Sequence, residues 1–195
     1  MNKFLVAATA LAAVMFASGA QAATVYSGAG FQITDNSTRT ATITVGENFS
    51  LSDVNITLLG LSHTFWGDLD ISLSHGGTTI WLTTDNGGGS DPSGDYTFDD
   101  QSATLVTALG PTGGTFQSQQ LLAAFNGMSA FGDWTLTVTD DAGADAGRLN
   151  GWSLSLDGLS SAVPEPSTWA MMLLGFFGLG SMVRASRRQQ AGVLA

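Results

Sequence analysis

The chain has 195 residues and carries six lysines and arginines against sixteen aspartates and glutamates, a formal net charge of −10. This length predicts one compact domain, and the acidic balance excludes nucleic-acid binding, which needs clustered Lys and Arg at the phosphates. Cysteine is absent, which excludes disulfide frameworks, thiol catalysis and cysteine-ligated metal centres.

The N-terminal end has the pattern of a secretory signal peptide. Lys3 is followed by an apolar run from Phe4 to Ala17 and then by an Ala20-x-Ala22 site, which is the order of features in an export signal. The run is short for a retained membrane anchor, which is the alternative. We therefore expect a signal peptide over residues 1–22, cleavage after Ala22 and an exported mature chain.

Short alternating segments between residues 23 and 162 predict β-strands. They are separated by Gly and Asp clusters that are typical of turns, and they cover residues 39–45, 53–58, 69–73, 79–83, 134–138 and 152–156. Residues 119–125 could form one helical turn or a further strand. This pattern predicts an all-β domain, a β-sandwich or jelly roll, over residues 23–162.

The same alternation separates the tryptophans of this domain into two kinds. Trp134 and Trp152 each begin an apolar row along one face of a strand, so we expect both in the core. Trp81 faces away from the apolar residues beside it, and Trp66 lies in a loop. Trp66 and Trp81 are therefore the candidates for a ligand contact, such as stacking on a sugar, against the alternative of ordinary packing.

Three segments of the middle region form a specific pattern: His63-Thr-Phe-Trp-Gly-Asp-Leu-Asp-Ile-Ser-Leu73, Gly132-Asp-Trp-Thr-Leu-Thr-Val-Thr-Asp140 and Asp145-Ala-Gly-Arg-Leu-Asn-Gly-Trp-Ser-Leu-Ser-Leu156. Together they resemble the P domain (also called Homo B) of kexin- and furin-like proprotein convertases. The resemblance implies a jelly-roll β-sandwich and a role for His63 in holding its loop by hydrogen bonds. The chain departs from it at Ser74-His75-Gly76, where many relatives have Ser-Pro before the turn.

No group of residues in the sequence predicts a catalytic site. P domains accompany a separate catalytic domain, His63 and His75 are the only histidines, and no Gly-x-Ser-x-Gly elbow is present. Adjacent aspartates, as at residues 99–100 and 140–141, point to opposite faces of a strand, so neither pair alone forms a glycosidase dyad. We therefore predict no catalytic residue and a non-enzymatic protein.

Aspartates in glycine-rich loops are candidate calcium ligands. Residues 23–162 hold fifteen acids against two bases, Arg39 and Arg148, and calcium takes about six to eight oxygen ligands from such loops. The alternative is that these aspartates only cap turns and keep an exported protein soluble. Calcium is the one candidate cofactor, and its candidate ligands are Asp85, Asp91, Asp99, Asp100, Asp140, Asp141 and Asp145.

The C-terminal end holds a second apolar run, from Trp169 to Val183, which would span about 22 Å as a helix against a hydrocarbon core of about 30 Å. A buried core helix is the alternative. The run follows a motif of Val163, Pro164, Glu165 and Pro166 and precedes Arg184, Arg187 and Arg188, which would keep the tail cytoplasmic. This order resembles the PEP-CTERM sorting signal. The resemblance implies processing by an exosortase-type membrane enzyme, with a sorting signal over 163–188, a transmembrane helix about 168–183 and a cytoplasmic tail over 189–195.

These features together predict an exported surface or matrix protein that is adhesive or structural and carries a P-domain-like module. The expected partners are the exosortase-type enzyme, extracellular polysaccharide and, before processing, the membrane. The protein would pass through the cell envelope and reach the surface or the extracellular space. The alternative function is a carbohydrate-binding module, or an accessory or hydrolase component that acts with a partner protease.

Overall fold

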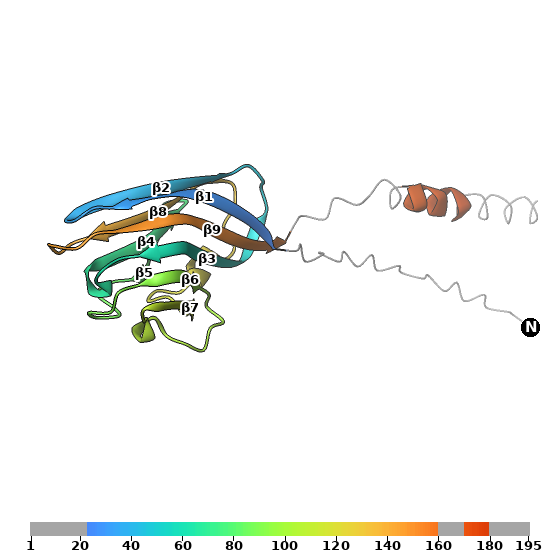
Figure 1. Ribbon diagram of the computed structural model, residues 1–195. Coiled ribbons are helices and arrows are strands. Elements are labelled where there is room, and N and C mark those ends of the chain that lie inside the picture. The colour runs from blue at the N-terminus through green and yellow to red at the C-terminus, as the bar shows by residue number, and fades with distance from the viewer. Residues whose placement is uncertain (1–22, 160–169, 180–195) are drawn as a thin grey trace, which may run out of the picture. The chain divides into compact units, whose positions relative to one another are not determined.

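The computed structural model describes residues 23–159 and 170–179. The first range is an all-β domain of two sheets (Figure 1), as the alternation predicts, and the second is a helix with an exposed surface. No helix within the described ranges has the length and apolar character needed to cross a membrane. The predicted signal peptide, the sorting motif at 163–166 and the three arginines that follow position 183 lie outside the described residues.

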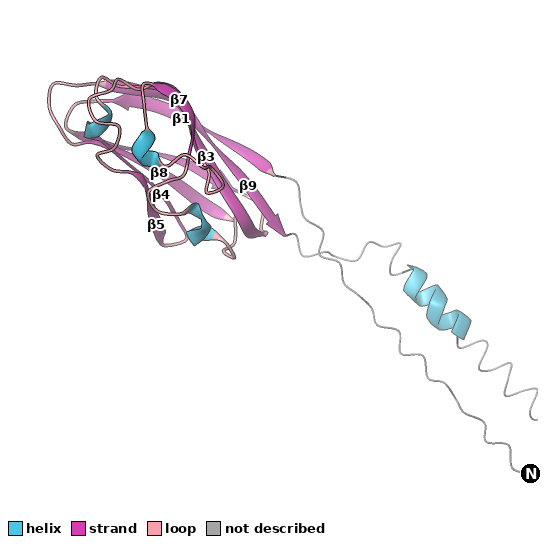
Figure 2. Cartoon of the chain, turned by 90° about the horizontal axis from the view of Figure 1, so that it is seen from below, coloured by secondary structure: helices cyan, strands magenta, loops and turns pink. Residues whose placement is uncertain are grey.

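All six predicted strand segments are strands, and the segment 119–125 contains a helical turn. The strands are β1 Thr24–Ile33, β2 Ser37–Val45, β3 Ser50–Ser62, β4 Leu69–His75, β5 Thr78–Thr83, β6 Ser93–Phe98, β7 Thr112–Phe116, β8 Gly132–Asp140 and β9 Gly147–Leu159. The 3₁₀ turns are η1 Trp66–Asp68, η2 Val106–Ala108 and η3 Leu122–Phe125. Figure 2 shows that these turns lie in the connections between strands.

The strands form a five-stranded sheet in the order β1-β9-β3-β6-β7 and a four-stranded sheet in the order β2-β8-β4-β5. Neighbours are antiparallel except β6 and β7, which are parallel. β4 and β5 are joined by a two-residue turn in which Gly76 and Gly77 both have positive φ, 56° and 84°. Two such glycines suit the tight primed turns of β-hairpins, so the departure at Ser74-His75-Gly76 changes the turn and leaves the hairpin intact.

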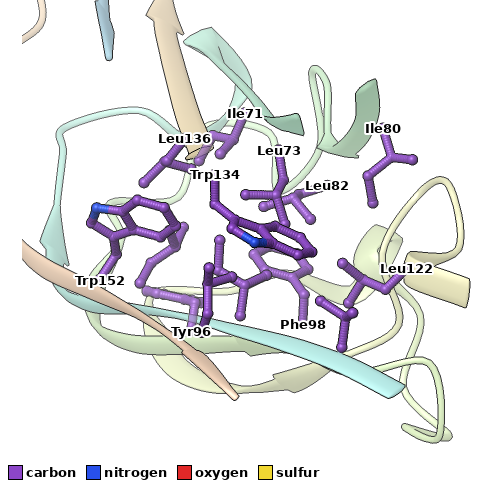
Figure 3. Packing of buried hydrophobic residues seen from close by; sticks show 14 of the residues in the cluster. Ile71, Leu73, Ile80, Leu82, Tyr96, Phe98, Leu122, Trp134, Leu136 and Trp152 are labelled. Carbon is purple, nitrogen blue, oxygen red and sulfur yellow. The ribbon is translucent and has the colours of Figure 1, made fainter. Parts of the chain in front are cut away.

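The core lies between the two sheets. Trp134 and Trp152 are both fully buried, which confirms their predicted place, and they pack among leucines, isoleucines and phenylalanines of both sheets (Figure 3). Each fully buried large apolar side chain stabilises the fold by about 1.5–3 kcal/mol. The polar residues that alternate with these buried residues along the strands point outward and form the outer faces of the sheets.

Candidate functional site

The antiparallel pair β4–β8 has a buried histidine near each of its ends. At one end Leu69 lies opposite Asp140, and at the other His75 lies opposite Trp134. His63 approaches the first end from the loop after β3, through its contact with Asp140. We call the first the acidic end (His63, Asp68, Asp70, Asp140 and neighbouring carboxylates) and the second the aromatic end (His75, Trp134 and Phe125).

At the acidic end His63 fastens its loop to the last residue of β8. Its Nε2 lies 3.2 Å from Asp140 Oδ2, and its Nδ1 lies 2.9 Å from the carbonyl oxygen of Phe65, whose N–H also donates to it at 3.2 Å. His63 is 4% exposed and Asp140 1%. Both ring nitrogens are thus engaged by protein groups, and the side chain acts as the loop fastener that the resemblance implies.

Two further carboxyls of the acidic end touch each other. Burial raises the pKa of Asp68, and a hydrogen bond with the Asp145 side chain and the charges of Asp145 and Asp140 raise it further, while His63 lowers it. Thr64 donates its hydroxyl to Asp145 Oδ1 at 2.6 Å. Asp140 Oδ1 is buried and has no hydrogen-bond partner in the described part of the chain. Negative charge is therefore concentrated here with one carboxylate oxygen left unsatisfied.

A second cluster of carboxyl groups at this end is centred on Asp70, in β4. Burial raises the pKa of Asp70, and the charges of Asp85 and Asp141 raise it further, against a hydrogen bond from the Asp85 backbone that lowers it. Asp70 Oδ1 is also buried without a hydrogen-bond partner within residues 23–159 and 170–179. Asp85 adopts the left-handed conformation, with φ of 53°, which aspartate tolerates better than most residues.

The seven predicted calcium ligands are divided among different places. Four reach the acidic end, Asp140 and Asp145 around Asp68, and Asp85 and Asp141 around Asp70. Asp68 and Asp70 were not among the candidates, although they occupy the Gly-Asp-Leu-Asp segment that opens β4. No set of three His, Cys, Asp or Glu side chains in the described ranges is arranged to hold a metal ion.

The other three candidates lie in loops away from this cluster. Asp100 accepts the N–H groups of Leu122 and Ala123 at 2.9 and 2.7 Å and so caps η3. Asp99 accepts the N–H of Gln101 at 2.7 Å, and Asp91 lies in the connection between β5 and β6. Asp99 and Asp100 therefore perform the turn-capping role that was the alternative to calcium binding.

The aromatic end is held by stacking and by backbone carbonyls. The imidazole of His75 stacks on Trp134, with ring centroids 4.0 Å apart and planes 2° from parallel, and Phe125 meets both rings edge-on. His75 Nδ1 lies 3.0 Å from the Asp133 carbonyl oxygen, and Nε2 lies 2.7 Å from that of Ser129. The ring therefore fastens the β4–β5 hairpin to the segment that leads into β8.

Of the two tryptophans that are candidates for a ligand contact, Trp66 is buried, so the structure corrects that expectation. Its side chain is 0% exposed, its Nε1 donates to the Gly110 carbonyl at 3.0 Å, and its ring meets Tyr96 edge-on at 4.9 Å. The turn η1 directs the side chain inward, so the ring cannot stack on a ligand. Trp81 is 38% exposed and remains available for a contact.

The outer face of the four-stranded sheet is formed almost wholly by hydroxyl side chains, and we call it the hydroxyl face. The strand registers place Thr40, Thr137, Ser72 and Trp81 in one row across β2, β8, β4 and β5, and Thr42, Thr135, Ser74 and Thr79 in the next. Thr38 and Thr139 extend the face beyond the first row, where their hydroxyl oxygens lie 3.0 Å apart. The sequence shows the alternation of each strand, but only the register joins the four strands into one surface.

A hollow of about 370 Å³ lies along β1 and β9, lined by Gly30, Phe31, Gln32, Arg148, Leu149 and Asn150. Its one cationic group, the guanidinium of Arg148, donates through Nε to Asn150 Oδ1 at 2.7 Å and through Nη2 to the same oxygen. A Cβ on Gly30 would lie 2.0 Å from the Leu149 carbonyl oxygen. β1 therefore approaches β9 so closely at this position that only glycine is tolerated there.

These features define an all-β sandwich module whose two histidines fasten loops. The family model of the proprotein convertase P-domain matches residues 51–156, which is more than half of the chain. The chain belongs to the proprotein convertase P-domain family, and the P domain is a non-catalytic domain.

Solved structures that the chain matches include the serine protease of Aeromonas sobria in complex with its chaperone. It is 18% identical, with a TM-score of 0.41, and 71% of this chain and 28% of that chain are covered. The Aeromonas sobria protease in a second structure is 19% identical, with a TM-score of 0.41 and coverage of 69% and 27%. The structure of FLHE is 9% identical, with a TM-score of 0.44 and coverage of 71% and 96%. The chain thus spans less than a third of the protease chains, and no curated protein matches its sequence.

Proposed function

We propose that this chain is a non-enzymatic, exported module with an adhesive or structural role at the cell surface or in an extracellular matrix. The observation that carries the non-enzymatic part is the state of the two histidines. Each ring nitrogen of His63 and His75 lies within hydrogen-bond distance of a backbone carbonyl or of Asp140. An imidazole engaged in this way cannot pass a proton between a nucleophile and an orienting carboxylate.

Export and sorting rest on the patterns of the two chain ends. The signal-peptide pattern of residues 1–22 supports secretion, and the resemblance of residues 163–188 to the PEP-CTERM signal supports processing by an exosortase-type enzyme. Mass spectrometry of the protein recovered from the cell surface tests both. We expect an N-terminus at Ala23 and a C-terminus near residues 163–166, whereas intact ends at residues 1 and 195 would contradict the proposal.

The adhesive role is tested by retention in the matrix, and the absence of catalysis by turnover. The full chain, expressed in a biofilm-forming host, should remain with the washed extracellular matrix, and the purified chain should hydrolyse neither casein nor nitrophenyl glycosides. A turnover that disappears in His63→Ala, or release of the whole protein into the medium, would overturn the proposal.

A second candidate function is an accessory role beside a protease, which the family membership favours. The chain would then stabilise a separate subtilisin-type protease. The decisive measurement is the thermal half-life of such a protease from the same cells, with and without the purified chain. A longer half-life would support this role, and an unchanged one would leave only the adhesive role.

Calcium at the acidic end is a further part of the proposal. The unsatisfied Oδ1 atoms of Asp140 and Asp70 and the contact between the Asp68 and Asp145 carboxyls suit a hard cation that accepts carboxylate oxygens. A cation there would require the loop between β8 and β9 to draw its carboxylates together.

A further inference from the structure

The hydroxyl face differs in charge from the rest of this strongly acidic molecule. Its two central rows hold only Thr and Ser side chains and Trp81, and its carboxylates, Asp70 and Asp133, stand at its two ends. In a chain with a net charge of −10, this face is a neutral strip between acidic borders. Exposed strands commonly keep lysine or glutamate for solubility, and none stands here.

The register makes the face regular. Neighbouring strands lie about 4.8 Å apart and successive outward side chains on one strand about 6.6 Å apart, so the Thr and Ser hydroxyls form a two-dimensional array. Each hydroxyl both donates and accepts a hydrogen bond. Thr40 and Thr42 are exposed, and Thr135 and Thr137 are half-buried, so the array lies at the surface rather than under a loop.

Trp81 lies at the edge of this array, and its backbone is hydrogen-bonded to Gln120. Its N–H donates to Gln120 Oε1 at 2.8 Å, and its carbonyl oxygen accepts the Gln120 N–H at 3.0 Å. The segment with Gln119 and Gln120 thus covers the open edge of β5. Ser72, opposite Trp81 in the register, is only 5% exposed. The backbone that carries the indole is therefore fixed beside the hydroxyl rows, which lowers the entropy lost on binding.

We propose that the hydroxyl face binds a neutral, extended polysaccharide, with a sugar ring on Trp81 and sugar hydroxyls paired to the exposed and half-buried Thr hydroxyls of the rows. This inference rests on the proposed adhesive function and names its ligand. The charge decides the class, because the acidic borders at Asp70 and Asp133 repel a polyanion, while a cationic polymer would prefer the carboxylates of the acidic end. A protein partner would favour a patch richer in aromatic residues and arginine, and a neutral polyhydroxyl chain matches rows of neutral hydroxyls.

The test is affinity electrophoresis, which measures the retardation of the full chain in gels that contain a polysaccharide. The neutral probes are hydroxyethyl cellulose, galactomannan and dextran, and the anionic probe is alginate. We expect retardation by at least one neutral probe and none by alginate. Trp81→Ala should weaken the binding about tenfold, which corresponds to about 1.4 kcal/mol. Trp81→Phe should restore part of it, because the ring platform remains.

The hydroxyl rows are tested by the double variant Thr40→Val and Thr137→Val, which removes two hydroxyls and keeps the branched shape. We expect at least threefold weaker binding. The matched control is Thr57→Val with Thr97→Val, a cross-strand pair on the outer face of the other sheet whose hydroxyl oxygens lie 2.9 Å apart. This control should bind like the original chain, and thermal melts should show that all variants fold.

Each other outcome overturns the inference. Binding that none of the hydroxyl-face variants weakens, or that the control pair weakens equally, would move the site elsewhere. Binding to alginate alone would contradict the charge argument. A chain that binds no neutral probe yet stays in the washed matrix would end this inference and leave the adhesive function standing, whereas release from the matrix would end that function itself.

Discussion

The two ends of the β4–β8 pair use the same residue type in physically different ways. At the acidic end His63 contacts a buried carboxylate that lies among several others. Attraction, repulsion and desolvation therefore determine how much this contact stabilises the fold. At the aromatic end His75 lies flat on Trp134 between two backbone carbonyls, so packing decides. The acidic end should therefore respond to pH and ions, whereas the aromatic end should respond to changes in side-chain shape.

Removing the indole of the aromatic end should have the largest effect. Trp134→Ala deletes a fully buried ring that stacks on His75 and meets Phe125, and such truncations cost about 3–5 kcal/mol. Urea denaturation measures the loss in the free energy of unfolding. The control is Trp81→Ala, which removes a ring that is 38% exposed and should cost below about 1 kcal/mol. Equal losses would show that Trp134 does not organise this end.

Removing the carboxylate of the acidic end should cost slightly less. Asp140→Ala leaves His63 buried without its partner, and breaking a buried pair from one side costs about 3 kcal/mol. The double variant with His63→Ala gives the coupling between the two side chains. Single losses that simply add would contradict a direct interaction.

How far the sequence predicts these ends depends on how local the signal is. The rows that begin at Trp134 and Trp152 were predicted because period-two alternation lies within one strand. β1, β6 and β7 were not, because glycine and serine weaken their strand signal, and pairing with neighbouring strands makes them strands. Trp66 was misplaced because alternation assigns no direction to a residue in the turn before a strand.

The candidate site depended on contacts that are distant in the chain. Asp68 joins Asp140 and Asp145 only because β4 pairs with β8 in one register, and a shift of one residue would turn every side chain to the other face. The hydroxyl face likewise needs the pairing of Thr40 with Thr137 and of Ser72 with Trp81. Sequence alone therefore identifies aspartate as the residue type of the acidic end, while the register determines which aspartates act together and which threonines share one face.

Calcium should affect stability through the acidic end and not the aromatic end, by a smaller amount than the substitutions. If calcium is added at about ten times its dissociation constant for the acidic end, the folded state gains about 1.4 kcal/mol. This gain is seen as a higher melting midpoint. Asp145→Asn should abolish this gain. Asp100→Asn is the matched control, because its carboxylate caps η3 and should leave the calcium response intact. A midpoint that calcium and chelator leave unchanged would remove calcium from the proposal.

The smallest expected effect is the pH dependence that Asp68 gives to the acidic end. Burial and the carboxyls of Asp145 and Asp140 raise its pKa in the folded chain, while in the unfolded chain its pKa is about 3.9. Between these two values the folded state keeps a proton that the unfolded state has lost, so stability falls as pH rises through this window.

Asp68→Asn should therefore stabilise the fold near neutral pH, by about 1 kcal/mol, which is a typical size for a single substitution. The gain should disappear in acid, where the original carboxyl is protonated in both states. Denaturant midpoints for both chains between acid and neutral pH measure it. If Asp68→Asn instead lowers stability at neutral pH, the ionised carboxylate of Asp68 holds a favourable contact, and the acidic end would be bound together by attraction rather than strained by repulsion.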